Sequence, residues 1–229
     1  MAYILHLETS TKQCSVALAS EGKLIASRVL QSDSYSHSEK LHFFISEVLE
    51  EARIKPADLA SIAVSMGPGS YTGLRIGVAA AKGFCFALDL PRIALNSLEI
   101  LAQAANSNEV EYIIPMLDAR RMEVYTAIFD INKNWIQDTS AIVLTQDSFI
   151  ETIGDKTVLV LGDGVEKFQG LDPKINLQYT SKIYYPNAVD MIQLAWDKYT
   201  SKAFESLAYF EPFYLKDFQT TPPKNKMEI

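Results

Sequence analysis

A glycine-rich segment is the most specific local feature of the sequence. Residues 66–73, Met-Gly-Pro-Gly-Ser-Tyr-Thr-Gly, follow a short apolar run and precede a long helical pattern. Free backbone N–H groups at the start of a helix can bind an anion such as phosphate. The segment is not a Walker A motif, because no Gly-Lys-Ser/Thr follows, and its glycine spacing differs from a dinucleotide fingerprint. The alternative interpretation is a tight strand-to-helix turn that allows close helix packing.

Two further positions carry residue types that a nucleotide site would use. Glu8-Thr9-Ser10 follows the first predicted strand, and Asp118 follows the corresponding strand of the second half. Phosphate loops need a carboxylate for the metal and small or hydroxyl residues around the phosphate. The first position meets this need in part, whereas Ala119-Arg120-Arg121 brings no glycine and crowds the phosphate position. A vestigial nucleotide site would comprise Glu8, Thr9, Ser10, Gly69, Ser70, Asp118 and Arg120. The alternative is a capped turn and a surface arginine pair.

The histidines and cysteines do not form a recognisable metal or nucleophile pattern. His37 and His42 are five positions apart, which on a helix turns the two rings about 140° from each other, whereas helical metal pairs are three or four apart. Cys14 and Cys85 lie far apart without a CxxC motif, and no GxSxG elbow is present. We expect no metal site, although counting residues leaves a Ser/His or Cys/His pair open.

Length, composition and charge limit the kind of protein. The chain has 229 residues, of which 48% are apolar, and this suits one domain or two small lobes with a buried core. The net charge of −7 provides no long-range attraction to phosphate backbones, and Arg120-Arg121 is the closest approach to a basic patch. No stretch approaches the roughly 18 apolar residues that span a bilayer. We expect a cytoplasmic protein without a membrane segment.

The elements that must position these residues occur twice in a similar order. In the first half the predicted strands are 3–7, 14–19, 24–30, 62–65 and 93–95, and the predicted helices are 39–52, 74–88 and 97–105. In the second half the predicted strands are 112–117, 123–131, 135–144 and 158–161, and the predicted helices are 147–153 and 188–202. Ser36 and Glu39 have the spacing of a capping box at the start of the first helix.

This repeated order predicts an α/β protein with the actin-like ATPase (ribonuclease H-like) fold. Each lobe would be a mixed sheet with helices. We expect an N-terminal lobe over residues 1–106 and a smaller, irregular C-terminal lobe with a docked tail over residues 107–229.

The two long helices of the first half predict a surface for close packing. Gly73, Gly77 and Ala81 fall on one line of the second helix, and small residues at this spacing let another backbone approach. Phe43 and Phe44 are adjacent in the first helix, so one ring can serve the core while the other faces outward. The alternative is that Phe43 is a lone exposed aromatic residue, which is common.

Several segments strongly resemble the bacterial TsaB family, also called YeaZ. The match is dense over residues 1–125, and the glycine-rich segment is its most specific part. The matching segments are 4–10, 14–18, 37–41, 67–77, 118–125 and 212–216. One departure is Glu8, where the family usually has Asp.

The resemblance implies a subunit of the machinery that makes N6-threonylcarbamoyladenosine at position 37 of tRNAs reading ANN codons. Such proteins resemble the catalytic paralogue TsaD, lack its working site and bind it as a heterodimer, while a small ATPase, TsaE, joins at the junction. By the resemblance, tRNA is bound only through the complex and ATP or ADP sits at the partner junction. The isolated chain would hold no cofactor tightly and could form a homodimer.

The resemblance also assigns the partner surface to the two long helices. Its residues would be His37, Leu41, Phe43, Phe44, Glu47, Val48, Tyr71, Gly73, Leu74, Gly77, Ala80, Ala81 and Phe84. The catalytic paralogue has a second histidine four positions after the first, and this chain has Leu41 there. A non-catalytic subunit without a metal is therefore implied. The rivals are a stand-alone ATPase or kinase of the same fold, a glycoprotease-like peptidase, and a homodimeric binding module outside tRNA modification.

Overall fold

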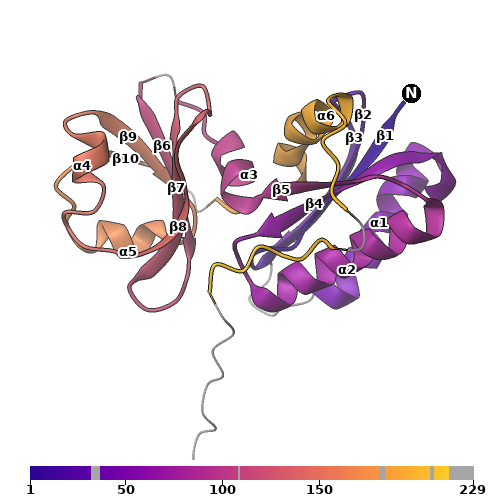
Figure 1. The fold of residues 1–229 in the computed structure, drawn as a ribbon, viewed down its shortest axis with the longest axis horizontal. Coiled ribbons are helices and arrows are strands. Elements are labelled where there is room, and N and C mark those ends of the chain that lie inside the picture. Colours follow the sequence, from indigo (N-terminus) through magenta and orange to yellow (C-terminus); the bar gives the residue numbers. More distant parts are fainter. Residues whose placement is uncertain (32–36, 108, 181–183, 207–208, 217–229) are drawn as a thin grey trace, which may run out of the picture.

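The computed structural model describes residues 1–31, 37–107, 109–180, 184–206 and 209–216, and within them the chain forms two lobes (Figure 1). The first lobe has a five-stranded sheet in the order β3-β2-β1-β4-β5. Its strands are β1 (Tyr3–Glu8), β2 (Gln13–Ser20), β3 (Lys23–Gln31), β4 (Leu59–Gly67) and β5 (Arg92–Asn96). The first three strands are antiparallel, and β4 and β5 run parallel to β1.

The second lobe repeats this sheet. Its order is β10-β9-β6-β7-β8, with an antiparallel meander followed by parallel strands. The strands are β6 (Tyr112–Asp118), β7 (Glu123–Asp130), β8 (Trp135–Val143), β9 (Thr157–Leu161) and β10 (Asn176–Tyr179). Two sheets with one strand order confirm the predicted actin-like fold.

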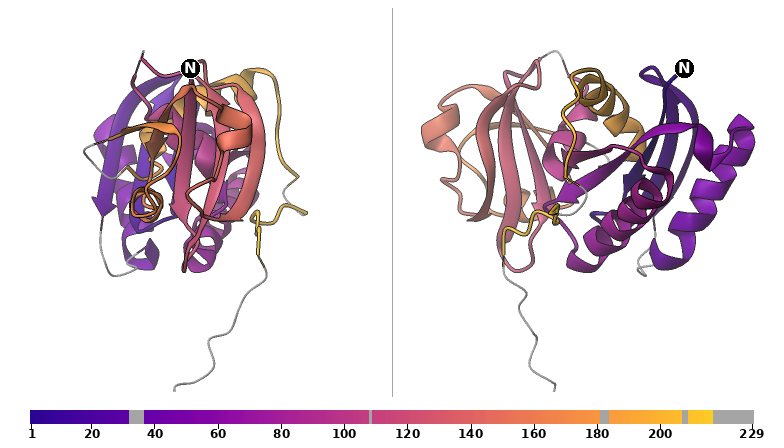
Figure 2. Two further views of the ribbon diagram at one scale, coloured as in Figure 1. Left: turned by 90° about the vertical axis from the view of Figure 1, so that its left-hand side faces the viewer. Right: turned by 45° about the vertical axis from the view of Figure 1, so that its right-hand side comes forward.

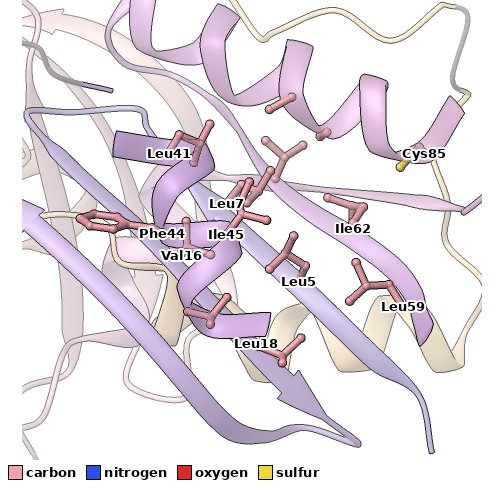
Figure 3. Close-up of a cluster of buried hydrophobic side chains, with 14 of the residues drawn as sticks. Leu5, Leu7, Val16, Leu18, Leu41, Phe44, Ile45, Leu59, Ile62 and Cys85 are labelled. Atoms are coloured by element: carbon pink, nitrogen blue, oxygen red, sulfur yellow. The ribbon is translucent and has the colours of Figure 1, made fainter. Parts of the chain in front are cut away.

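Helices cover both faces of the first sheet, which explains why residues 4–8 of β1 are all buried. The side chains of Leu5 and Leu7 face α1 (His37–Ala52) and α2 (Tyr71–Leu88), as Figure 3 shows. Ile4, which precedes Leu5 in the chain, faces the opposite side, because successive side chains of a strand alternate. There it meets the 3₁₀ turn η2 (Ala188–Met191) and α6 (Ile192–Thr200).

The C-terminal segment therefore returns to the first lobe, which the division at residue 106 did not anticipate. Ala188, Met191 and Ala195 pack into one cluster with residues of β1 and β5. Residues 209–216 then run along the end of α2 towards the second lobe (Figure 1 and Figure 2). The short helix α3 (Ser97–Gln103) lies between the lobes, where Leu98 and Leu101 share a cluster with residues of β6 and β7.

Several predicted boundaries shift in the structure. The helix predicted over 188–202 is a 3₁₀ turn followed by α6, and the helix predicted over 147–153 is the single turn α4 (Ile150–Ile153). The sequence did not predict α5 (Val165–Gln169) or the edge strand β10, which have five and four residues. The predicted capping box includes Ser36, which lies outside the described residues. The 3₁₀ turn η1 (Pro56–Asp58) separates α1 from β4.

Two features that would indicate a general class of function are absent from the described residues. None of the described helices has the length and apolar character needed to cross a membrane. Within the same residues, no group of three or more His, Cys, Asp or Glu side chains is arranged to hold a metal ion.

Candidate functional site

The turn between β1 and β2 is the first half of the predicted nucleotide site, and α2 clamps it. The backbone N–H of Ser70 donates to the Ser10 carbonyl at 2.6 Å, and the Thr9 hydroxyl donates to the Gly73 carbonyl at 2.8 Å. From α1, His37 donates through its Nε2–H to the Thr11 carbonyl at 2.7 Å, and burial lowers the pKa of this ring. Thr9 and Ser10 are thereby fully buried.

The glycines of the glycine-rich segment make this clamp possible. A Cβ atom at Gly69 would collide with the Ser10 carbonyl, and one at Gly73 or Gly77 would collide with Thr9. The predicted close approach of a backbone is therefore real, but the approaching backbone belongs to this chain. Gly73 and Gly77 consequently face the interior of the lobe and do not form a surface for a partner.

The carboxyl group of Glu8 lies beneath the turn and is fully buried. Its Oε1 accepts a hydrogen bond from the backbone N–H of Ser10 at 2.6 Å. Burial raises the pKa of Glu8 to about 6, and the nearby hydroxyl groups of Ser10 and Ser65 oppose this shift. Within the described chain neither hydroxyl completes a hydrogen bond of good geometry, and Glu8 Oε2 has no partner.

The second half of the predicted nucleotide site is exposed and already ion-paired. Asp118 Oδ1 accepts from Lys167 Nζ at 2.6 Å and from the backbone N–H of Arg120 at 2.5 Å. Asp163 accepts from the backbone N–H of Asp118 at 2.9 Å, and burial raises its pKa. Arg120 has a φ of 67°, a left-handed conformation that favours glycine. The predicted nucleotide residues thus divide into two sets. At the clamped turn, Glu8, Thr9 and Ser10 are buried and Gly69 and Ser70 are half-buried, whereas Asp118 and Arg120 are exposed and Asp118 is ion-paired. Nucleotide binding stays a prediction.

A groove between α1 and α2 opens on the outer face of the first lobe. It has a volume of about 550 Å³ and is lined by Ser38, His42, Ile76, Ala79, Ala80, Gly83, Phe84 and Ala87. The His42 ring stacks on Phe84 with the two ring centroids 6.4 Å apart. Phe43 and Phe86, each next in sequence to a lining residue, expose 57% and 82% of their surface. The groove and these two rings form what we call the helix-pair surface.

Most residues predicted for the partner surface are buried beneath the helix-pair surface. Residues from both helices fill the core of the first lobe, because the apolar stripe of each helix faces its own sheet. The buried members are His37, Leu41, Phe44, Val48, Gly73, Leu74, Gly77, Ala80 and Ala81. Glu47 is half-exposed and pairs with Arg28 at 3.1 Å, and the Tyr71 ring packs against Tyr214. Of the predicted set, Phe43 and Phe84 remain available, with the surface of Ala80 that lines the groove.

Sequence reasoning missed Ala79, Gly83, Phe86 and Ala87. A weak signal was present, because these residues recur at helical spacing on a stripe away from the core. The signal is weak because small residues also occur on exposed helix faces that bind no partner. The amino-acid composition of docking surfaces differs little from that of the remaining protein surface.

Comparison with known proteins identifies the family. Residues 25–186 match the family model described as TsaD, tRNA N6-adenosine threonylcarbamoyltransferase. The tRNA threonylcarbamoyladenosine biosynthesis protein TsaB of Haemophilus influenzae is 30% identical over 93% of each chain, and that of Bacillus subtilis is 37% identical over 58% of each. The solved structure of YeaZ from Pseudomonas aeruginosa is 28% identical, with a TM-score of 0.79 over 94% of this chain and 100% of that one. A second solved structure, described as an uncharacterized protein with similarity to peptidase YEAZ from the same organism, is 27% identical with a TM-score of 0.80 over the same shares of the two chains. The chain therefore belongs to the TsaB (YeaZ) family, within the wider family that the TsaD model describes.

Proposed function

We propose that this chain is a non-catalytic subunit of tRNA threonylcarbamoyladenosine biosynthesis that binds a TsaD-like catalytic paralogue. The observation that carries the proposal is the helix-pair surface, an apolar groove whose lining residues adjoin the exposed Phe43 and Phe86 in the sequence. An exposed apolar surface of this kind is typical of a site that another protein covers. The name of the H. influenzae relative, a tRNA threonylcarbamoyladenosine biosynthesis protein, supports the reaction in which the complex takes part.

The shared family supports a TsaD-like paralogue as the occupant of this surface. Since the family model described as TsaD matches this chain across α1 and α2, such a paralogue should present a comparable pair of helices. Two similar surfaces can pair about an approximate twofold axis, as in an isologous dimer. The same geometry allows two copies of this chain to pair when the paralogue is absent.

The clamped turn supports a non-catalytic role. Thr9 and Ser10 are buried against α2, and His37 is engaged with the turn. Leu41 fills the core at the position where the paralogue would carry the second histidine of its metal pair. In the proposed arrangement ATP or ADP is held at the partner junction, a TsaE-like ATPase joins there, and tRNA is bound only through the complex. We place this complex in the cytoplasm.

A leave-one-out reconstitution tests the function. The synthase that makes threonylcarbamoyl-adenylate, the paralogue, the small ATPase and this chain are mixed with unmodified tRNA, threonine, bicarbonate and ATP. Mass spectrometry then quantifies the modified adenosine. We expect product to disappear when this chain is omitted, and this chain without the paralogue to make none. Equal product without the chain would refute the proposal and favour a stand-alone ATPase or a binding module outside tRNA modification. Cleavage of peptides by the chain alone, if a chelator inhibits it, would favour the peptidase.

A pair of matched variants tests the surface. Ala79→Arg places a charge inside the groove, and we expect at least about a tenfold loss of affinity for the paralogue, or about 1.4 kcal/mol. Ala203→Arg is the control, because Ala203 is an exposed alanine that follows α6 on the opposite face of the sheet. Calorimetric titration of the paralogue with each variant measures the difference. Equal affinities for the two variants would place the interface elsewhere.

A further inference from the structure

The C-terminal residues 209–216, here called the strap, begin on the first lobe. Phe210 is buried there, and the Arg92 guanidinium lies 4.2 Å from the centre of its ring. Arg92 is itself almost fully buried and donates from Nη2 to the Ser206 carbonyl at 2.6 Å. Of these two contacts, the one between the Phe210 ring and the Arg92 guanidinium belongs to the strap, and it places the start of the strap in the core of the first lobe.

The middle of the strap lies on the end of β4 and the first turn of α2. The Phe213 N–H donates to the Met66 carbonyl at 2.7 Å. Gly67, with a φ of 109°, leaves room for the Phe213 carbonyl, which a Cβ atom would approach to 2.8 Å. Tyr214 packs on Tyr71 with 4.9 Å between ring centroids, and its hydroxyl accepts from Arg75 Nε at 3.3 Å.

The far end of the strap reaches the second lobe. The ammonium group of Lys216 forms an ion pair with Glu123 and lies 5.8 Å from the centre of the Tyr125 ring. Both partners belong to β7. The side chains of Lys216 and Glu123 are only 30% and 24% exposed, so solvent screens this pair less than an open surface pair. Eight residues thus run from the core of one lobe to the sheet of the other (Figure 1 and Figure 2).

The lobes have a separate connection at α3. Leu98 and Leu101 of α3 pack with residues of the second sheet, and Asn96 donates to the Thr139 hydroxyl at 2.8 Å. In Figure 1 this connection lies apart from the strap, which crosses on the side of α2. Two bodies joined at one helix can rotate about it, as hinged domains do. A second connection away from that helix restrains the rotation.

We propose that the strap is an internal clamp that fixes the angle between the two lobes. It ties the first turn of α2 to β7 through Tyr214 and Lys216. The clamp uses only residues of this chain, and its existence does not depend on the proposed function or on a bound nucleotide.

Interlobe distances in the full-length chain test the clamp. Cys14 and Cys85 are 1% exposed, and burial raises the pKa of these thiols to about 12 and about 11, so they react poorly with thiol reagents. Cysteines introduced as Glu50→Cys on α1 and Glu151→Cys on α4 are exposed and accept spin labels. Pulsed electron paramagnetic resonance then gives the distance distribution between the lobes.

Charge reversal supplies the decisive comparison. Lys216→Glu places two carboxylates together, and we expect a broader distribution or a shifted mean distance. The swapped pair Lys216→Glu with Glu123→Lys should restore the original distribution. Lys174→Glu is the control, because Lys174 pairs with Asp147 at 2.7 Å within the second lobe, and it should change nothing.

Three outcomes would overturn the clamp. They are an unchanged distribution in Lys216→Glu, the same change in Lys174→Glu, and a swapped pair that fails to restore the distance. Circular dichroism of each variant confirms that the compared chains are folded.

Discussion

At the scale of single residues, the glycines of α2 show how a missing side chain shapes the site. Gly73 and Gly77 let the helix lie directly against Thr9, and the Thr9 hydroxyl then bonds to the Gly73 carbonyl at 2.8 Å. A buried hydroxyl must find such a partner or lose stability. The turn and the helix therefore fit each other, and enlarging either one disturbs both.

Gly77→Ala tests this fit. The added Cβ would collide with the Thr9 hydroxyl, so we expect a loss of about 1–3 kcal/mol in the free energy of unfolding. The control is Gly83→Ala in the same helix, because nothing lies within 4 Å of its added Cβ. Alanine should stabilise the helix there by about 0.5–1 kcal/mol relative to glycine. Denaturant unfolding of both variants measures the contrast, and equal effects would show that the close approach does not matter.

Glu8 predicts a pH dependence of opposite sign to that of a carboxylate whose pKa is lowered by an ion pair or by hydrogen bonds. Its pKa in the folded chain is about 6 against an ordinary value of 4.5, so between these values the folded state binds more protons than the unfolded state. Stability from this group is therefore full below pH 4.5 and falls as the pH rises to 6, by about 2 kcal/mol. His6, whose pKa burial lowers to about 4, changes stability in the other direction over an overlapping range.

The comparison of Glu8→Gln with the natural chain isolates this contribution. Gln keeps an oxygen that can accept from the Ser10 N–H but does not titrate. The difference in unfolding free energy between the two proteins should change between pH 4.5 and 6 and stay constant above that range. Urea unfolding at a series of pH values measures it. A constant difference across the whole series would mean that Glu8 titrates at its ordinary value.

At the scale of elements, α1 and α2 show what the sequence can and cannot predict. The helix α1 follows from its apolar periodicity, and α2 follows from an almost uninterrupted run of apolar or small residues. That run predicts a helix buried all round, but α2 exposes one face, where Phe86 is 82% exposed. Apolar residues in these helices do not identify a partner surface, because residues such as Leu41 and Leu74 are buried in the core of their own lobe. The groove depends instead on small residues such as Ala79 and Gly83, whose exposure only the packed helices reveal.

The short elements mark a second limit. α5 and β10 have five and four residues, too few to display a helical or strand period. The duplicated sheet order was nevertheless predictable, because the longer strands repeat in the same sequence in both halves. The strap was recognised only as a docked tail, since its partners Met66, Tyr71 and Glu123 are distant in the chain.

At the scale of the whole molecule, one surface should serve two assemblies. The helix-pair surface belongs to the first lobe and lies on the opposite side of the sheet from α6. If it accepts both a paralogue and a second copy of this chain, the two assemblies exclude each other. Self-association then depends on protein concentration and on the amount of paralogue present.

Sedimentation velocity tests this competition. We expect the isolated chain to form a concentration-dependent dimer that Ala79→Arg dissociates, because the arginine places a charge in the shared groove. Ala203→Arg should dimerise as the natural chain does. Addition of the paralogue should convert the homodimer into a heterodimer of one copy each. A dimer that persists in Ala79→Arg would show that the chain pairs with itself through another surface.

The glycine-lined contact between α2 and the turn also limits how this chain can evolve. A larger residue at Gly69, Gly73 or Gly77 would push the turn at Thr9 and Ser10 away from the helix and break the bonds that Ser70 and Thr9 now make. Single substitutions at these three glycines should therefore cost stability. Gly83 of the same helix meets nothing within 4 Å, so the outward face of α2 can accept new side chains at positions where the inward face cannot.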